Sequence, residues 1–552
     1  MPVLDDTADV LLYRANVRTL DPALPRAEAV AVRGERIVGV GSERELAPLV
    51  GRRTRCLDLG GRTLVPGFHD THNHLSSTGL GLLRVSLEGC RDIAELVGRL
   101  VERARATPRG EWVVTAEIGE PAISHALAER RYPTRADLDP ALPDHPVCIQ
   151  APHILILNSA ALQRVGVSRA TPDPPGGRLG RDAEGELDGR FYEPAAMALV
   201  RPHLPSRTHA ERVAGIRAAC AAYHRVGLTS VCEHGASLEA LAAYQDLWAR
   251  GELTVRSYVH VHLDTHPALP EIADRLAHLA FTSGPGFGDT WLRVAGVKLF
   301  VDGGVGIGTA LMRAPYRTAD GQLSHGLQLV APDKLLAILR LARRHGLRVA
   351  QHDSGGRAID VVLDSYAQVH SEQPIDGLRW TLVHCQFPSA ANLAAIRRLG
   401  AVVVTQTVFL YTMGQGYVRY LGRELAEEAI PLRRWLDAGL PVALGSDAPV
   451  NPYPPLLGLW HATTRIDRTT GEVLGAAQRV SRAEALWLYT AAGAYITFDE
   501  GRKGQIAPGQ LADLVALGDD PLTCDEAALP TLPVDLTMVG GRIVHAAPAL
   551  RA

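Results

Sequence analysis

RTLVPGFHDTHNH, residues 62–74, is an apolar run that ends in two histidines, and it introduces a pattern that recurs along the chain. His72 and His74 lie two residues apart, so on an extended strand both side chains point to the same face. Two imidazoles that converge on one point are what a shared metal ion requires. A His-x-His pair by itself is weak evidence, because histidine is often a partly exposed residue with no such role.

Apolar runs of this kind alternate with amphipathic, alanine-rich stretches that are typical of helices. The eight runs cover residues 62–74, 227–235, 255–263, 293–304, 347–356, 379–386, 401–407 and 441–449. Near-continuous Val, Leu and Ile in such runs is typical of parallel strands that are buried on both faces. Eight of them predict an α/β protein built on a closed (β/α)8 TIM barrel.

The interval between the first and second runs is far too long for one crossover helix. We therefore expect residues 75–226 to hold an inserted cap. Both chain ends contain short β-branched runs broken by glycine-rich turns, as in ADVLLYRANV and VDLTMVGGRIVHA. The sequence predicts one small β-sandwich built from residues 1–65 and 500–552, with the barrel over residues 66–499.

Composition excludes several classes of protein. The chain has 552 residues, of which 46% are hydrophobic, and this is enough for a large core. Lys and Arg number 57 against 60 Asp and Glu, a formal charge of −3, so we expect no nucleic-acid partner. No apolar run reaches about eighteen residues, and the start lacks a signal-peptide pattern. Seven scattered cysteines without a Cys-x-x-Cys pair indicate free thiols in a reducing, cytoplasmic location.

Polar side chains that could bind a metal lie in or at the ends of other runs. They are Lys298, His352, His384 and Asp447. Strand alternation places Lys298 opposite the face of Val297 and Leu299, so its amine should point into the barrel. Any one of these residues could be a buried core residue, but together with His72 and His74 they favour a site at the strand ends. Imidazole and carboxylate ligands favour zinc, with iron, manganese or nickel as alternatives.

PGFHDTHNH, GVKLFVDGG, the runs around His352 and His384, and GSDAP together resemble the amidohydrolase superfamily. The narrower resemblance is to its YtcJ-like branch, which includes N-substituted formamide deformylases, and it covers nearly the whole chain. It implies that His72, His74 and Asp447 hold one metal. It further implies that Lys298, as a carbamate, bridges to a second metal held by His352 and His384, although one or two metals per chain stay open.

The resemblance implies a hydrolase that cleaves a non-peptide C–N bond of a small molecule: an amide, an N-substituted formamide or a related group. Water activated by the metal would attack the carbonyl carbon. Asp447 and His384 are the predicted catalytic residues. Asp447 would move a proton from that water to the leaving nitrogen, and His384 would help to stabilise the oxyanion.

The sequence departs from the YtcJ-like branch in the fifth apolar run, residues 347–356. The branch has His followed by a Gly-Asp pair, whereas here His352 precedes Asp353-Ser354-Gly355-Gly356, so Gly356 stands in place of the usual acid. Asp353 could substitute from a different offset. Two other functions stay open: the same metal site used for a lyase, isomerase or cyclase step in specialised metabolism, and a non-catalytic amidohydrolase-like scaffold.

The candidate substrate contacts are Trp112, Glu117, His153, Asn158 and Tyr316. His153 and Asn158 belong to HILILNSAAL, which also resembles a motif of the branch, and a buried turn anchor is their alternative role. An aromatic residue in a cap more often packs than binds a ligand.

Glu233 and His234 end the second run. A salt-linked loop is the favoured interpretation of this pair, and a place in the site is the other. The expected partner of the protein is a small-molecule substrate. A homodimer is expected on general grounds only, because most soluble oligomers are symmetric dimers.

Overall fold

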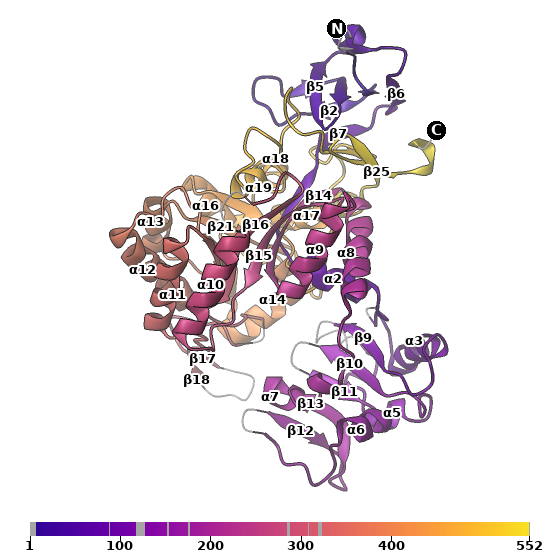
Figure 1. Cartoon of the computed structure of the whole chain (residues 1–552), viewed down its shortest axis with the longest axis vertical. Coiled ribbons are helices and arrows are strands. Elements are labelled where there is room, and N and C mark those ends of the chain that lie inside the picture. The colour runs from indigo at the N-terminus through magenta and orange to yellow at the C-terminus, as the bar shows by residue number, and fades with distance from the viewer. Residues whose placement is uncertain are drawn as a thin grey trace. The chain divides into compact units, whose positions relative to one another are not determined.

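The computed structural model describes residues 7–87, 89–117, 127–151, 154–174, 177–283, 287–306, 308–317 and 323–550. The chain divides into two compact units. One unit joins Met1–Leu75 to Cys220–Ala552, and the other is Ser76–Ala219, which compares with the insertion of 75–226 expected from the sequence. Figure 1 shows the elements of both.

The first unit contains an eight-stranded parallel sheet that is rolled into a nearly closed barrel (Figure 1). In spatial order its strands are β8 (Phe68–Asn73), β14 (Leu228–Ala236), β15 (Arg256–His262), β16 (Leu292–Phe300), β19 (Arg348–Asp353), β20 (Thr381–His384), β21 (Val402–Thr405) and β22 (Val442–Leu444). The last strand returns to the first: Asp447 N donates to His72 O at 2.7 Å, and Thr71 Oγ1 donates to Leu444 O at 2.8 Å. The predicted barrel is confirmed.

Helices cover the outside of the barrel, and local sequence fixes where they begin and end. Ser237 caps α9 (Leu238–Ala249), and Ser389 caps α13 (Ala390–Leu399), each through its side chain. Gly400 ends α13 at φ 61°, a left-handed conformation that glycine adopts freely. The other helices here include α10 (Leu269–Ser283), α11 (Pro332–Arg344), α12 (Gly356–Glu372), α14 (Val408–Leu421), α16 (Leu432–Asp437), α17 (Pro455–Thr464), α18 (Arg482–Leu488) and α19 (Ala491–Ile496).

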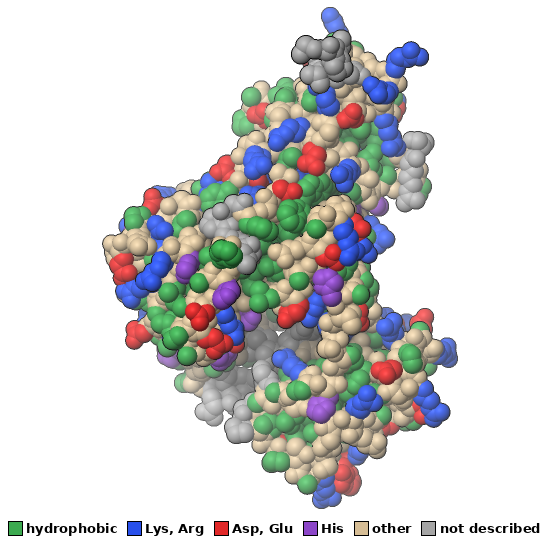
Figure 2. Space-filling view, viewed as in Figure 1, with side chains coloured by type: hydrophobic (Ala, Val, Ile, Leu, Met, Phe, Trp, Pro, Cys, Tyr) green, Lys and Arg blue, Asp and Glu red, His purple; other side chains and the backbone are tan. Residues whose placement is uncertain are grey.

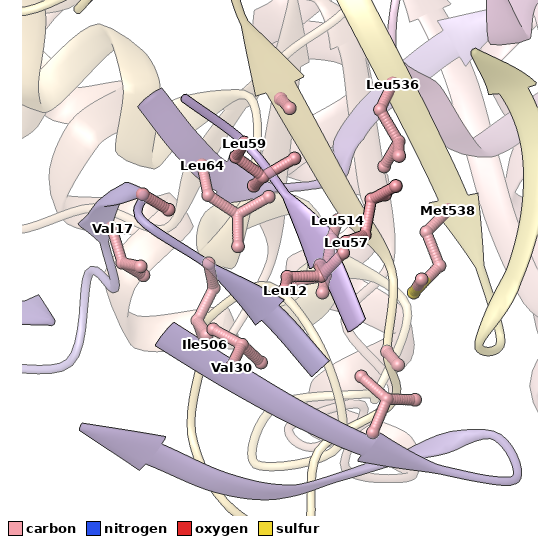
Figure 3. Packing of buried hydrophobic residues seen from close by; sticks show 14 of the residues in the cluster. Leu12, Val17, Val30, Leu57, Leu59, Leu64, Ile506, Leu514, Leu536 and Met538 are labelled. Carbon is pink, nitrogen blue, oxygen red and sulfur yellow. The ribbon is translucent and has the colours of Figure 1, made fainter. Parts of the chain in front are cut away.

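Two further sheets are formed by the chain ends. One contains β5 (Arg36–Gly41), β4 (Ala29–Arg33), β1 (Val10–Tyr13) and β6 (Arg55–Asp58), and the other contains β25 (Arg542–Ala546), β24 (Val534–Val539), β23 (Leu514–Leu517), β7 (Thr63–Pro66), β2 (Asn16–Arg18) and β3 (Arg26–Ala27). Figure 3 shows Leu12 and Val30 of the first sheet in one cluster with Leu64, Leu514 and Leu536 of the second. These fully buried side chains form a shared apolar core, so the two sheets stabilise each other.

The second unit is built on a mixed five-stranded sheet, which the sequence did not predict. Its order is β12 (Arg178–Arg181), β13 (Leu187–Tyr192), β11 (Ile154–Leu157), β10 (Val147–Ala151) and β9 (Val113–Glu117). Val147 and Ile149 pack with Leu96 and Leu100 of α3 (Ile93–Arg105), whereas Cys148 between them packs into a second cluster. Both faces of the sheet are therefore covered.

Over the described residues, no helix combines the length and the hydropathy that a bilayer crossing requires. Figure 2 shows basic and acidic side chains interspersed over the visible face, in keeping with the small net charge.

A buried ion pair joins the barrel to the terminal sheets. Arg256, at the start of β15, donates from Nε to Asp513 Oδ2 at 2.7 Å and from Nη2 to Oδ1 at 3.0 Å. Both side chains are at most 4% exposed. The amide of Gly540 also donates to Asp513 Oδ1, at 2.9 Å. Such a bidentate pair is favourable only while both partners are present, because either charge alone would be buried and unpaired.

We expect Asp513→Ala to destabilise this unit by about 3–5 kcal/mol, because it leaves the Arg256 guanidinium buried without its carboxylate. Urea unfolding followed by tryptophan fluorescence measures the change. Glu372→Ala is the control, since Glu372 pairs with Arg340 at the exposed surface and should leave the midpoint unchanged. Equal midpoints for both variants would contradict a role for the buried pair.

Candidate metal centre

Three predicted ligands meet where the first and last barrel strands end. His72 belongs to β8, His74 follows that strand, and Asp447 follows β22. Asp447 Oδ1 lies 3.1 Å from His72 Nε2 and 3.0 Å from His74 Nε2. Two ligands that are each ~2.0–2.1 Å from a tetrahedral zinc lie about 3.3 Å apart, and both distances to Asp447 are close to that value. The ligand atoms of all three residues lie within 4.8 Å of one another.

Burial and mutual contact set the protonation of this group. Burial opposes ionisation of Asp447, but the imidazoles of His72 and His74 hold its pKa well below the usual value. Burial lowers the pKa of His72 to about 3, although Asp447 acts against that shift. An ionised carboxylate beside a neutral imidazole is the form in which both bind a metal.

A glycine and a buried acid bring the two strand ends together. A Cβ on Gly445 would lie 2.4 Å from the backbone nitrogen of His72, so no larger residue fits here unless the strands separate. Asp70 accepts hydrogen bonds from the backbone nitrogens of His72 and Ser446, and from the side chain of Asn73. Asp70 thus fixes the position of His72 relative to the loop that carries Asp447. At Asp447 itself φ is 61°, a strained conformation typical of functional positions.

His352, His384 and Lys298 form the second part of the centre. The His384 ring lies 4.4 Å from that of His352 and 5.1 Å from that of His72, measured between centroids. Lys298 is 1% exposed, and its Nζ has no hydrogen-bond partner among the described residues. Burial lowers its pKa to about 7, with Asp447 among the opposing charges. This buried amine has a single lone pair and could not bridge two metal ions itself, whereas a carbamate formed from it could, and no hydrogen bond from the described residues occupies its Nζ.

Two residues that the sequence analysis did not select hold these histidines in orientation. Asp302 Oδ1 lies 3.1 Å from His352 Nδ1, and Gln406 Oε1 lies 2.6 Å from His384 Nδ1. Because an oxygen accepts in each pair, Nδ1 carries the proton and Nε2 keeps the lone pair that a metal needs. The sequence offers only weak signals for them: Asp302 shares a strand face with Lys298, and Gln406 is the last residue but one of the seventh apolar run.

At Gly356, where the branch has an acid, the guanidinium of Arg313 occupies the space that a side chain would need. A Cβ there would lie 2.5 Å from Nη1 of Arg313. Arg313 pairs instead with Asp360, one turn further along α12, at 2.8 and 2.7 Å. Neither carboxylate oxygen of Asp353 has a hydrogen-bond partner in the described part of the chain, and its substitution for the usual acid stays a prediction.

The candidate substrate contacts lie in varied surroundings. Trp112 belongs to an apolar cluster of the second unit. Asn158 is fully buried; its Oδ1 caps α6 (Ser159–Val165) by accepting from Ala161 N, and its Nδ2 donates to backbone carbonyls. Tyr316 is buried and donates to Ala310 O at 2.9 Å.

Glu117 ends β9, but its side chain lies outside the described part, as does the whole of His153. A substrate contact by any of these residues stays a prediction.

Glu233 and His234 lie within β14, and Glu233 accepts a hydrogen bond from Tyr244 at 2.7 Å.

We expect Asp302→Asn to weaken zinc binding by about 10–100-fold. If the amide oxygen of the new side chain accepts from His352 Nδ1, its NH2 group faces the backbone nitrogens of Leu311 and Gly355, which now donate to Asp302 Oδ2, so the contact that orients His352 is disturbed. Competition with a chromophoric chelator measures the affinity. Asp520→Asn, at a buried acid that pairs with Arg18 in the terminal sheets, is the matched control and should bind zinc as the parent does. If both variants bind zinc equally well, Asp302 does not orient a ligand.

Comparison with known proteins agrees with this geometry. The sequence matches the amidohydrolase family over residues 55–545. YtcJ of Bacillus subtilis (strain 168), whose name describes it as an amidohydrolase, is 31% identical over 94% of this chain and 96% of its own. The N-substituted formamide deformylase of Arthrobacter pascens is 30% identical over 97% of each chain. A solved structure, an uncharacterised metal-dependent hydrolase from Pyrococcus horikoshii, is 25% identical, with a TM-score of 0.75 over 94% of this chain and 99% of that one. The resemblance seen in the motifs is confirmed, and the chain belongs to the amidohydrolase family.

Proposed function

We propose that this protein is a metal-dependent hydrolase of non-peptide C–N bonds in small molecules, with N-substituted formamides and related amides as the first substrates to test. One observation carries the proposal: His72, His74 and Asp447 converge at the strand ends, within a barrel that also buries Lys298, whose Nζ has no hydrogen-bond partner among the residues that the structure describes. Family membership supports hydrolysis. The deformylase relative supports the formamide class.

The residues that would hold the metal form two sets. His72, His74 and Asp447 would hold one divalent ion, and Lys298, His352 and His384 would hold a second. Zinc suits these nitrogen and oxygen ligands best. When bound, the ion would lower the pKa of a water molecule and polarise the substrate carbonyl.

Lys298 becomes a ligand if its neutral amine adds carbon dioxide. The nitrogen lone pair attacks the carbon, one N–H proton is released, and a carbamate whose two oxygens share one negative charge remains. The lowered pKa of Lys298 supports this step, because the amine must be unprotonated to react.

Asp447 would move the proton. Its low pKa keeps the carboxylate ionised, so it can accept a proton from the attacking water and deliver it to the leaving nitrogen. The transfer matters because an amine leaves poorly unless it is protonated. The Nδ1 of His384 donates to Gln406, so its Nε2 keeps the lone pair and suits a metal ligand. Nε2 could act at the carbonyl oxygen only if it were protonated as well, because an oxyanion needs a donor.

We expect full-length protein to release formate and an amine from N-substituted formamides, and chelation to abolish the activity until zinc is restored. Asp447→Asn should lower kcat/KM by about 10²–10⁴-fold through loss of proton transfer. Asp520→Asn, in the terminal sheets, should retain the parental rate.

Mass spectrometry of the products separates the alternatives, because hydrolysis adds the mass of one water. A product of unchanged mass would indicate an isomerase or cyclase, and stoichiometric metal without turnover of any amide would indicate a scaffold. The small-molecule partner, the homodimer and the cytoplasmic location stay predictions.

A further inference from the structure

Two buried histidines that belong to neither proposed ligand set extend in a row from His72. His234 contacts His72, and His260 contacts His234. His234, in β14, has its Nδ1 2.5 Å from His72 Nδ1. The ring of His260, in β15, lies 4.6 Å from that of His234. All three side chains are at most 2% exposed. The barrel interior therefore contains a row of imidazoles that begins at a predicted metal ligand and leads away from Asp447.

The short contact between His72 and His234 is a hydrogen bond and not shared coordination. Two nitrogens on one tetrahedral zinc would lie about 3.3 Å apart, given Zn–N distances of ~2.0–2.1 Å. At 2.5 Å the two Nδ1 atoms repel each other unless one proton lies between them. His72 turns its Nε2 toward Asp447, and if that nitrogen binds the proposed metal it needs its lone pair. The one proton of the neutral ring then belongs on Nδ1, and His234 accepts it with its own Nδ1 lone pair.

The backbone of β14 provides for this placement. The register between β14 and β15 shifts after His234, so that Gly235 is an extra residue without a partner. Gly235 has a φ of 101°, which side-chain-bearing residues rarely adopt, and a Cβ there would lie 3.9 Å from His74 Cε1. Bulges of this kind redirect side chains beside active sites.

We propose that His234 is a positioning residue for the metal centre, which fixes the tautomer and orientation of His72 through an imidazole–imidazole hydrogen bond. A carboxylate or a carbonyl oxygen usually takes this place behind a metal-bound histidine. Asp302 and Gln406 do so here for His352 and His384. His72 differs because its acceptor is a neutral ring nitrogen, which supports the ligand without adding a negative charge.

This inference rests on the proposed metal centre, and a pair of nearly isosteric substitutions tests it. His234→Asn retains an oxygen acceptor near the position of Nδ1, whereas His234→Leu offers none. The full-length proteins are stripped with chelator, and their zinc affinity is measured by competition with a chromophoric chelator. We expect about 10–100-fold weaker binding for the Leu variant and binding within about threefold of the parent for the Asn variant.

His260→Leu is the matched control. It removes a buried imidazole from the same row, but neither ring nitrogen of His260 has a hydrogen-bond partner among the described residues. Its zinc affinity should equal that of the parent. If it falls as far as that of the His234→Leu variant, packing and not the hydrogen bond supports His72, and the inference is overturned.

The remaining outcomes distinguish failure of the proposed metal centre from failure of the proposed role of His234. Failure of the parent protein to bind zinc would overturn the metal centre itself. Tight binding by the parent together with unchanged affinity in His234→Leu, or equal losses in the Leu and Asn variants, would overturn only the role of His234. Thermal unfolding of each metal-free protein shows whether it is folded, and His234→Met replaces the Leu variant if that variant does not fold.

Discussion

The carboxylate of Asp447 lies between the imidazoles of His72 and His74, and this contact joins the last strand of the barrel to the first. A buried carboxylate is costly unless hydrogen-bond donors or a cation compensate it. A metal ion held by the same three side chains would meet this requirement as a cation. Closing the barrel therefore also brings the three candidate ligands together. Gly445 permits this because its lack of a side chain lets the last strand approach the first.

Three of the four histidines of the centre are each supported by a different kind of acceptor. Asp302 provides a carboxylate for His352, Gln406 an amide oxygen for His384, and His234 a ring nitrogen for His72. These acceptors come from three separate strand ends or loops. Each of these histidines is oriented by a residue from another strand or loop. The orientation of the ligands therefore depends on how the barrel strands are aligned with one another.

The barrel and its candidate ligands could be predicted from sequence because both depend on short-range pattern. Apolar runs mark buried parallel strands, and position within a run gives the direction of a side chain such as Lys298. Partners across strands leave no such mark. Asp302 and Gln406 were passed over, and for His234 a salt-linked loop was the favoured interpretation, because their contacts depend on which strands are neighbours and on a bulge at Gly235.

The five-stranded sheet of the second unit was missed for a related reason. Its strands are short and covered on both faces, so the run ILIL of β11 has no alternation that separates a strand from a buried helix. The hydrogen bonds of Asn158 likewise depend on partners elsewhere in that unit.

The pairing of β7 with β23 has a consequence for biosynthesis. Val65 lies opposite Val515, so β7 acquires this neighbour only after the 450 residues that follow Val65, up to Val515, have been synthesised. Until then Leu12, Leu64 and the rest of their apolar cluster lack the strands that cover them. During most of elongation the N-terminal segment therefore exposes apolar side chains. Nascent chains in this condition tend to aggregate unless chaperones bind them.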